Sequence, residues 1–87
     1  KDKFWMIKNN KLISENDSID AGSLNYFHNN FLIQISITKN ADLEIIITNI
    51  NNKDIIYNKI SPIDFIIDEN QITIYGNDYI DKVNLYD

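Results

Sequence analysis

Aromatic side chains are the groups in this 87-residue chain best suited to contact a ligand. The chain has no Arg and one His, and its eight Lys are scattered, so few other side chains combine a large contact area with a polar handle. Aromatic rings stack on sugars and are favoured at protein interfaces. We therefore predict that a protein or glycan ligand contacts an aromatic patch, formed mainly by the C-terminal hairpin: Trp5, Tyr75, Tyr79 and Tyr86.

Strand alternation divides these rings between two faces. It places Tyr79 on the face of Val83 and Leu85, and Tyr86 on the opposite face with Ile80, so at least one ring lies outside the core. The alternative is that the rings complete the core and leave only their hydroxyls at its rim.

Acidic residues crowd the C-terminal third of the chain and offer weak candidates for a calcium site. Asp64 and Asp68 share one face of a predicted strand, and Asp78 lies in a predicted turn. Carboxylate oxygens on loops are the ligands that Ca²⁺ prefers, but no EF-hand spacing is present. Acids opposite an isoleucine face are also the ordinary solvated side of a strand. The sequence therefore predicts neither a metal nor a cofactor.

Catalytic patterns are scarce. His28 is the only histidine and lies at a predicted strand end, where a half-exposed structural role is the ordinary interpretation. With only Gly22 and Gly76, the chain has neither a nucleophile elbow nor a glycine-rich phosphate loop. We predict that the protein is not an enzyme.

Charge and composition exclude several kinds of partner. The formal net charge is −5, from 13 acidic and 8 basic residues, and the absence of Arg argues against nucleic-acid binding. No apolar run approaches the roughly 20 residues of a membrane helix, which argues against membrane insertion. The chain begins at Lys1 and holds no signal-peptide segment. We interpret it as a mature or trimmed chain, secreted or in the cell envelope, from which a leader has been removed.

The elements that would position these residues are strands. Isoleucine alone supplies 19 of the 87 residues, and apolar residues alternate with polar ones over most of the chain. The pattern predicts a single all-β domain over residues 1–87, an antiparallel β-sandwich of seven or eight short strands, with a small β-barrel as the alternative. The predicted strands cover residues 3–8, 24–28, 31–38, 42–49, 54–60, 63–67, 71–75 and 79–86.

Turn residues and the apolar period predict the turns, the longest loop and the core of this domain. Asn pairs such as Asn9-Asn10, Asn29-Asn30 and Asn51-Asn52 predict tight turns, because Asn tolerates the left-handed conformation. The aperiodic segment 14–23 is predicted to be the longest loop. The shared period of two predicts one core made of Ile33, Ile35, Ile37, Leu43, Ile45, Ile47, Ile55, Tyr57, Phe65, Ile67, Ile72, Ile74 and Val83.

The middle of the chain resembles a known family over about residues 24–60. Ile47-Thr48-Asn49 followed by Ile56-Tyr57 fits a recurring phrase of the small secreted immunoglobulin-like β-sandwich domains of unknown function from Bacteroidota. Asn52 stands where that phrase usually has Gly, and the L-P-A-G-x-Y phrase expected next is absent. The resemblance implies an immunoglobulin-like sandwich and an exported location, and it implies no catalytic residues.

Two classes of function fit these observations. One is a non-enzymatic exported domain that binds protein or glycan at the cell surface. The other is a structural or accessory module of a larger surface, toxin or phage protein.

Overall fold

The protein is described by a computed structural model over residues 5–86, and that part of the chain is all-β. Its ten strands are antiparallel and follow one another at short intervals, because the β-prone runs are separated by turn residues. They are β1 (Met6–Lys8), β2 (Lys11–Ser14), β3 (Asp17–Asp20), β4 (Leu24–His28), β5 (Phe31–Ile37), β6 (Leu43–Asn49), β7 (Ile55–Ile60), β8 (Asp64–Asp68), β9 (Gln71–Tyr75) and β10 (Ile80–Asn84).

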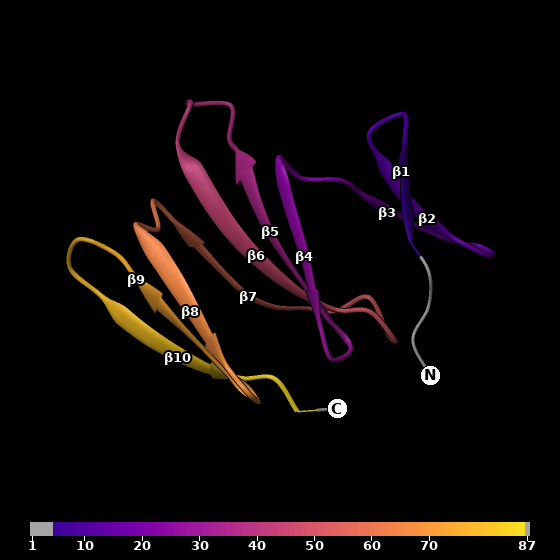
Figure 1. Cartoon of the computed structure of the whole chain (residues 1–87). Coiled ribbons are helices and arrows are strands. Elements are labelled where there is room, and N and C mark those ends of the chain that lie inside the picture. The colour runs from indigo at the N-terminus through magenta and orange to yellow at the C-terminus, as the bar shows by residue number, and fades with distance from the viewer. Residues whose placement is uncertain (1–4, 87) are drawn as a thin grey trace.

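Three open sheets form layers, with the four-stranded sheet β4-β5-β6-β7 between the other two (Figure 1). The sheet β10-β9-β8 packs on one of its faces and the sheet β1-β2-β3 on the other. Strand order within each sheet follows the chain, so each sheet is a meander. This connectivity differs from the Greek-key crossings of immunoglobulin domains.

The main core lies between the central sheet and the β8–β10 sheet. It is a β-sandwich core, built from inward-facing residues of both sheets. Its buried members are Phe31, Ile33, Ile45, Ile47, Ile72, Ile74 and Leu85.

A smaller core lies on the other face of the central sheet. Leu32, next to Ile33 on β5, points to this face and is buried with Leu12 of β2 and Ile50. Trp5 and Phe27 pack against the same cluster, with their ring centroids 5.5 Å apart.

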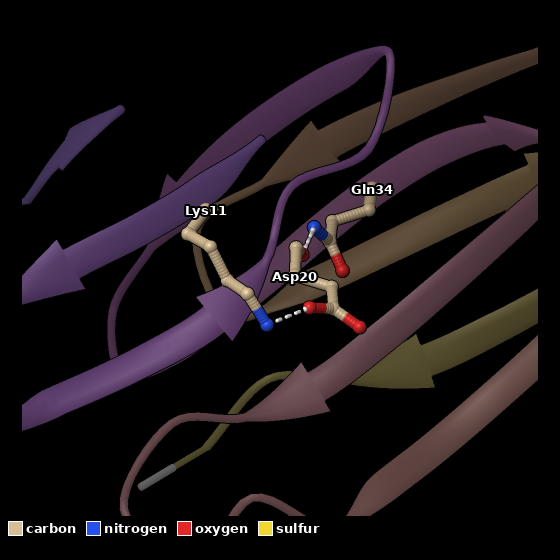
Figure 2. A network of polar contacts seen from close by, with 3 residues as sticks. All are labelled: Lys11, Asp20 and Gln34. Atoms are coloured by element: carbon tan, nitrogen blue, oxygen red, sulfur yellow. Dashed lines mark hydrogen bonds and ion pairs between the residues drawn. The ribbon is translucent and has the colours of Figure 1, made fainter. Parts of the chain in front are cut away.

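A polar network fastens the end of β3 to the central sheet (Figure 2). The buried Gln34 amide donates hydrogen bonds to the Asp20 carbonyl oxygen and to Asn25 Oδ1, both at 2.8 Å. Lys11 Nζ reaches Asp20 Oδ1 at 2.6 Å from the neighbouring strand. The chain then crosses β5 so closely at Gly22 that a Cβ there would lie 2.9 Å from the Ile35 carbonyl oxygen.

The structure confirms the all-β sandwich and corrects the predicted elements. Seven or eight strands were too few, because β2 was not predicted and because segment 14–23, predicted to be a loop, contains β3. The pattern there is weak because β3 is short and Ile19 is the one apolar residue among its four. The predicted turn at Asn29 has the left-handed conformation, with φ 54°. In the Asn51-Asn52 turn the left-handed residue is instead Lys53, with φ 64°.

The predicted core is correct except at its ends. Ile37 and Leu43 are exposed because they lie where the β8–β10 sheet does not cover the central sheet. Ile55 is exposed because it points to the other face of the central sheet. Phe31 and Leu85 are buried and were missed.

Candidate functional site

An open cleft of about 450 Å³ lies along β7, the last strand of the central sheet. Residues of β6 and β7 form one wall, and the turn between β9 and β10 forms the other. The lining residues are Glu44, Asn58, Lys59, Ile60, Asp78 and Tyr79.

The β6–β7 register brings two polar side chains of the cleft together. Glu44 pairs with Ile60 and Ile46 pairs with Asn58, so Glu44 and Asn58 share one face of the sheet on neighbouring strands. Asn58 Nδ2 donates a hydrogen bond to Glu44 Oε2 at 3.1 Å. A carboxylate oxygen has further lone pairs, so this pair can still accept hydrogen bonds from a ligand.

Lys59 points to the opposite face of β7, toward the β8–β10 sheet. Its ammonium lies 3.4 Å from Asp81 Oδ2, and the same carboxylate oxygen accepts a hydrogen bond from the Tyr57 hydroxyl at 2.7 Å. Lys59 Nζ also lies over the Tyr79 ring, 4.8 Å from its centroid. These contacts join β7 to β10 and hold the ammonium at the side of the cleft.

Tyr79 is fixed against the free edge of β7. Its hydroxyl donates to the Ile60 carbonyl oxygen at 3.2 Å. This oxygen faces away from β6, because the adjacent Ser61 N–H already donates to the Leu43 carbonyl oxygen (2.7 Å) and antiparallel bonding alternates. The ring packs so tightly on Gly76 that a Cβ there would lie 2.0 Å from a ring carbon.

Burial and charge perturb three groups around this contact. Burial, reinforced by the hydrogen bond to Asp81, raises the pKa of the Tyr57 phenol well above its ordinary value. The hydrogen bond from Tyr57 and the nearby Lys59 hold the pKa of Asp81 below its ordinary value. Burial raises the pKa of Tyr79, and Lys59 opposes that shift. At neutral pH both phenols are therefore protonated donors and Asp81 is a carboxylate.

The predicted aromatic residues do not form one patch. Tyr79 contacts the main core and lines the cleft, as its shared face with Leu85 predicts. Tyr75 pairs with Ile80 and points to the outer face of the β8–β10 sheet. Tyr86 is 64% exposed and lies beyond the other end of β10, seven residues and roughly 20 Å from Tyr79. Trp5 is stacked on Phe27, in the smaller core.

The three candidate calcium ligands are also separated. Asp64 and Asp68 lie at the two ends of β8, roughly 13 Å apart, and Asp78 lies in the β9–β10 turn. Within residues 5–86 no group of three His, Cys, Asp or Glu side chains is placed to hold a metal ion.

His28 belongs to a contact between the two sheets of the sandwich. Its Nε2–H donates to the Glu69 carbonyl oxygen in the β8–β9 turn. The adjacent Asn29 donates to Asn70 Oδ1 at 3.1 Å and to the Leu85 carbonyl oxygen at 3.0 Å. This arrangement fits the structural interpretation of the histidine.

Sequence reasoning named Tyr79, and Asp78 as a calcium candidate, but missed the other four lining residues: Glu44, Asn58, Lys59 and Ile60. Glu44 and Asn58 are 14 positions apart and meet only through strand pairing. The predicted hairpin of strands 42–49 and 54–60 was the available signal. Its register could not be read from the sequence, because an irregularity between Ile47 and Thr48 shifts the pairing.

Comparisons of this chain with protein-family models, curated proteins and solved structures found no match. Over residues 5–86 the structure contains no helix with the length and hydropathy needed to cross a membrane.

Proposed function

We propose that this domain is a non-enzymatic, exported binding module at the cell surface, and that it binds a glycan in the cleft along β7. The observation that carries the proposal is the lining of that cleft. Polar side chains from both faces of β7 and a fixed aromatic ring line one open, solvent-accessible cleft. Such a site suits a ligand rich in hydroxyl groups.

Each lining residue has a role that a saccharide can use. The Glu44 carboxylate accepts hydroxyl hydrogens, while the Asn58 amide both donates and accepts. Tyr79 supplies apolar surface beside these polar groups. Strand pairing and the hydrogen bond from the Tyr79 hydroxyl hold the β6–β7 wall of the cleft in place. Binding therefore requires little ordering of the protein.

The test is a glycan array followed by titration calorimetry on the double variant Glu44→Gln/Asn58→Ala. A saccharide that binds the wild type should lose about tenfold or more in affinity, because two hydrogen-bonding groups are altered. Tyr86→Ala, altered at the far end of β10, is the control and should bind normally. If Tyr86→Ala abolishes binding and the double variant does not, the cleft is not the site.

A second candidate, an assembly module, is favoured by a different observation. Leu24, Tyr26, Ile37 and Leu43 are 45–63% exposed and lie on the face of the central sheet that carries the main core. Contiguous exposed apolar surface is typical of protein contacts. If this surface joins copies of the chain, sedimentation should show concentration-dependent association that Ile37→Lys removes. A monomer at all concentrations would exclude self-assembly.

A further inference from the structure

The strand β4 differs from the other edge strands of the three sheets. Each sheet is open, so residues 5–86 contain six edge strands: β1, β3, β4, β7, β8 and β10 (Figure 1). Edge strands carry unpaired backbone groups, and proteins commonly protect them with charged side chains, proline or bulges. Five of the six contain a lysine or an aspartate, and β7 also has a register shift in its pairing with β6. The strand β4 has none of these protections.

The backbone of β4 offers two residues to a further strand. His28 and Phe31 close a two-residue turn, so they form a hydrogen-bonded pair. Because antiparallel bonding alternates, the N–H and C=O groups of Tyr26 point to β5, while those of Asn25 and Phe27 point outward. Within residues 5–86 no backbone hydrogen bond from a turn or loop reaches these outward groups. They are therefore available to another strand.

Apolar side chains are exposed on the same strand. Leu24 is 50% and Tyr26 is 48% exposed, and both lie on the face of the central sheet that carries the main core. They form the β4 part of the apolar surface that continues to Ile37 and Leu43. Unpaired backbone groups and exposed apolar side chains are separate observations, and each indicates that β4 is a contact strand.

We infer that two copies of this chain join through β4, each strand antiparallel to its counterpart, so that their central sheets form one continuous sheet. The inference rests on the assembly candidate described above and adds the contacting strand and its register. It does not depend on glycan binding.

A second copy fits this edge in one register. With Tyr26 opposite Tyr26 of the other copy, Asn25 lies opposite Phe27, and every outward N–H and C=O group of both strands is bonded. The two Tyr26 rings then meet at the two-fold axis, and Leu24 lies opposite His28. No acidic or lysine side chain lies in the pair, so the net charge of −5 on each copy brings no close repulsion there.

The length of β4 also favours a copy over a longer strand of another protein. The chain enters the sheet at Leu24 and turns directly after His28, so a longer partner would find no further groups to bond. A pair of such short strands buries less than the roughly 1,600 Å² of a standard stable interface. We therefore expect a weak dimer, populated between about 10 µM and 1 mM protein.

Charged variants at Tyr26 test this register by sedimentation over that concentration range. Tyr26→Lys alone and Tyr26→Glu alone each place like charges opposite one another at the two-fold axis, so each should weaken dimerisation about tenfold. An equimolar mixture of the two variants should recover dimerisation, because opposite charges then meet. Mixing would not rescue variants that had merely failed to fold.

Two sets of controls separate the β4 edge from overall charge and from the sheet face. Ile66 is 54% exposed on the outer face of the β8–β10 sheet, so Ile66→Lys and Ile66→Glu change the net charge equally. Each should leave dimerisation within about twofold of the wild type. Ile37 shares the face of Tyr26 but does not meet its counterpart in this register, so mixing Ile37→Lys with Ile37→Glu should give no recovery.

Amide hydrogen exchange measures the proposed backbone bonds directly. At a concentration where the wild type is dimeric, the amides of Asn25 and Phe27 should exchange more slowly in the wild type than in Tyr26→Lys. A contact made only by side chains of the sheet face would leave these two amides unprotected.

The outcomes distinguish the inference from the proposals on which it builds. If the chain associates but the Tyr26 variants behave like the Ile66 controls, or their mixture shows no recovery, pairing through β4 is wrong while assembly stands. If the wild type stays monomeric up to 1 mM, the inference and the assembly candidate are both wrong, and glycan binding is unaffected.

Discussion

At the scale of single residues, the Tyr57–Asp81 hydrogen bond couples stability to pH. Burial and Asp81 raise the pKa of Tyr57 above its unfolded value of 10.0, so the folded protein holds the phenol proton more tightly than the unfolded chain does. This stabilisation is complete below about pH 10 and is lost as the pH rises above it. The contribution of Asp81 to stability has the opposite pH dependence. Because folding lowers the pKa of this carboxyl, its carboxylate stabilises the fold at pH values above the unfolded pKa of 3.8, and that contribution is lost as the pH falls.

Tyr57→Phe tests this coupling. At about pH 8 the variant should be less stable than the wild type by about 1 kcal/mol, since it lacks one hydrogen bond to a carboxylate at a half-buried position. By about pH 11 that difference should shrink, because only the wild type loses the phenol contribution. Urea unfolding at both pH values measures it. A difference that stays constant or grows with pH would show that the bond does not link folding to phenol ionisation.

Ser14 is the opposite case, a buried polar side chain that we expect to lower the stability of the fold. Its hydroxyl is buried and has no hydrogen-bond partner within residues 5–86. Ser14→Ala should therefore stabilise the protein by about 1 kcal/mol, because a buried unsatisfied hydroxyl is removed. Ser18→Ala, at an exposed position of β3, should stay within about 0.5 kcal/mol of the wild type. A loss of stability on Ser14→Ala in thermal unfolding would mean that the hydroxyl makes a bond in solution.

At the scale of elements, the β5–β6 turn stores backbone strain. Ala41 has φ 66°, a left-handed conformation that its Cβ disfavours and that glycine adopts freely. Ala41→Gly should raise the free energy of unfolding by about 1 kcal/mol. Ala21→Gly is the matched control, since Ala21 has no positive φ and packs against the smaller core, and it should lower stability. If both variants lose stability, the turn is not strained.

How far the sequence predicts these elements depends on how each one is buried. The strand β6 has one buried apolar face, so Ile45 and Ile47 alternate with less buried neighbours and the period of two is plain. In β5 both faces are covered, and the prediction found Ile33 but not the burial of Leu32. The fold class was therefore predictable, whereas the third layer was not, because its contacts depend on which sheet covers which face.

The candidate site was predictable only in part for a related reason. Tyr79 could be recognised from its own chemistry and its place in a hairpin. Glu44 and Asn58 are ordinary solvated residues in their own strands and become a pair only through the register of β6 with β7. A single sequence carries turn signals that set a hairpin but does not carry the irregularity that shifts its register.

At the scale of the whole molecule, the two cores are unequal. The described residues place seven buried side chains in the core between the central sheet and the β8–β10 sheet, and three in the core beneath the β1–β3 sheet. The outer β1–β3 layer in Figure 1 is therefore held by less apolar contact than the sandwich proper. Segments with few buried contacts open at lower free energy than the global unfolding free energy. We expect the β1–β3 layer to open while the sandwich stays folded.

Leu32 and Ile33 give a matched test, since they are neighbours on β5, both are almost fully buried, and they point into different cores. Leu32→Ala should speed amide hydrogen exchange in β1–β3 while β5, β6 and β9 stay protected, because it weakens only the contact of the outer layer. Ile33→Ala should speed exchange in all three sheets and lower the global stability by about 2–5 kcal/mol, because it opens a cavity in the main core. Native-state exchange followed by NMR resolves these strands. If both variants lose protection uniformly, the three layers unfold as one cooperative unit and the unequal cores do not set the order of opening.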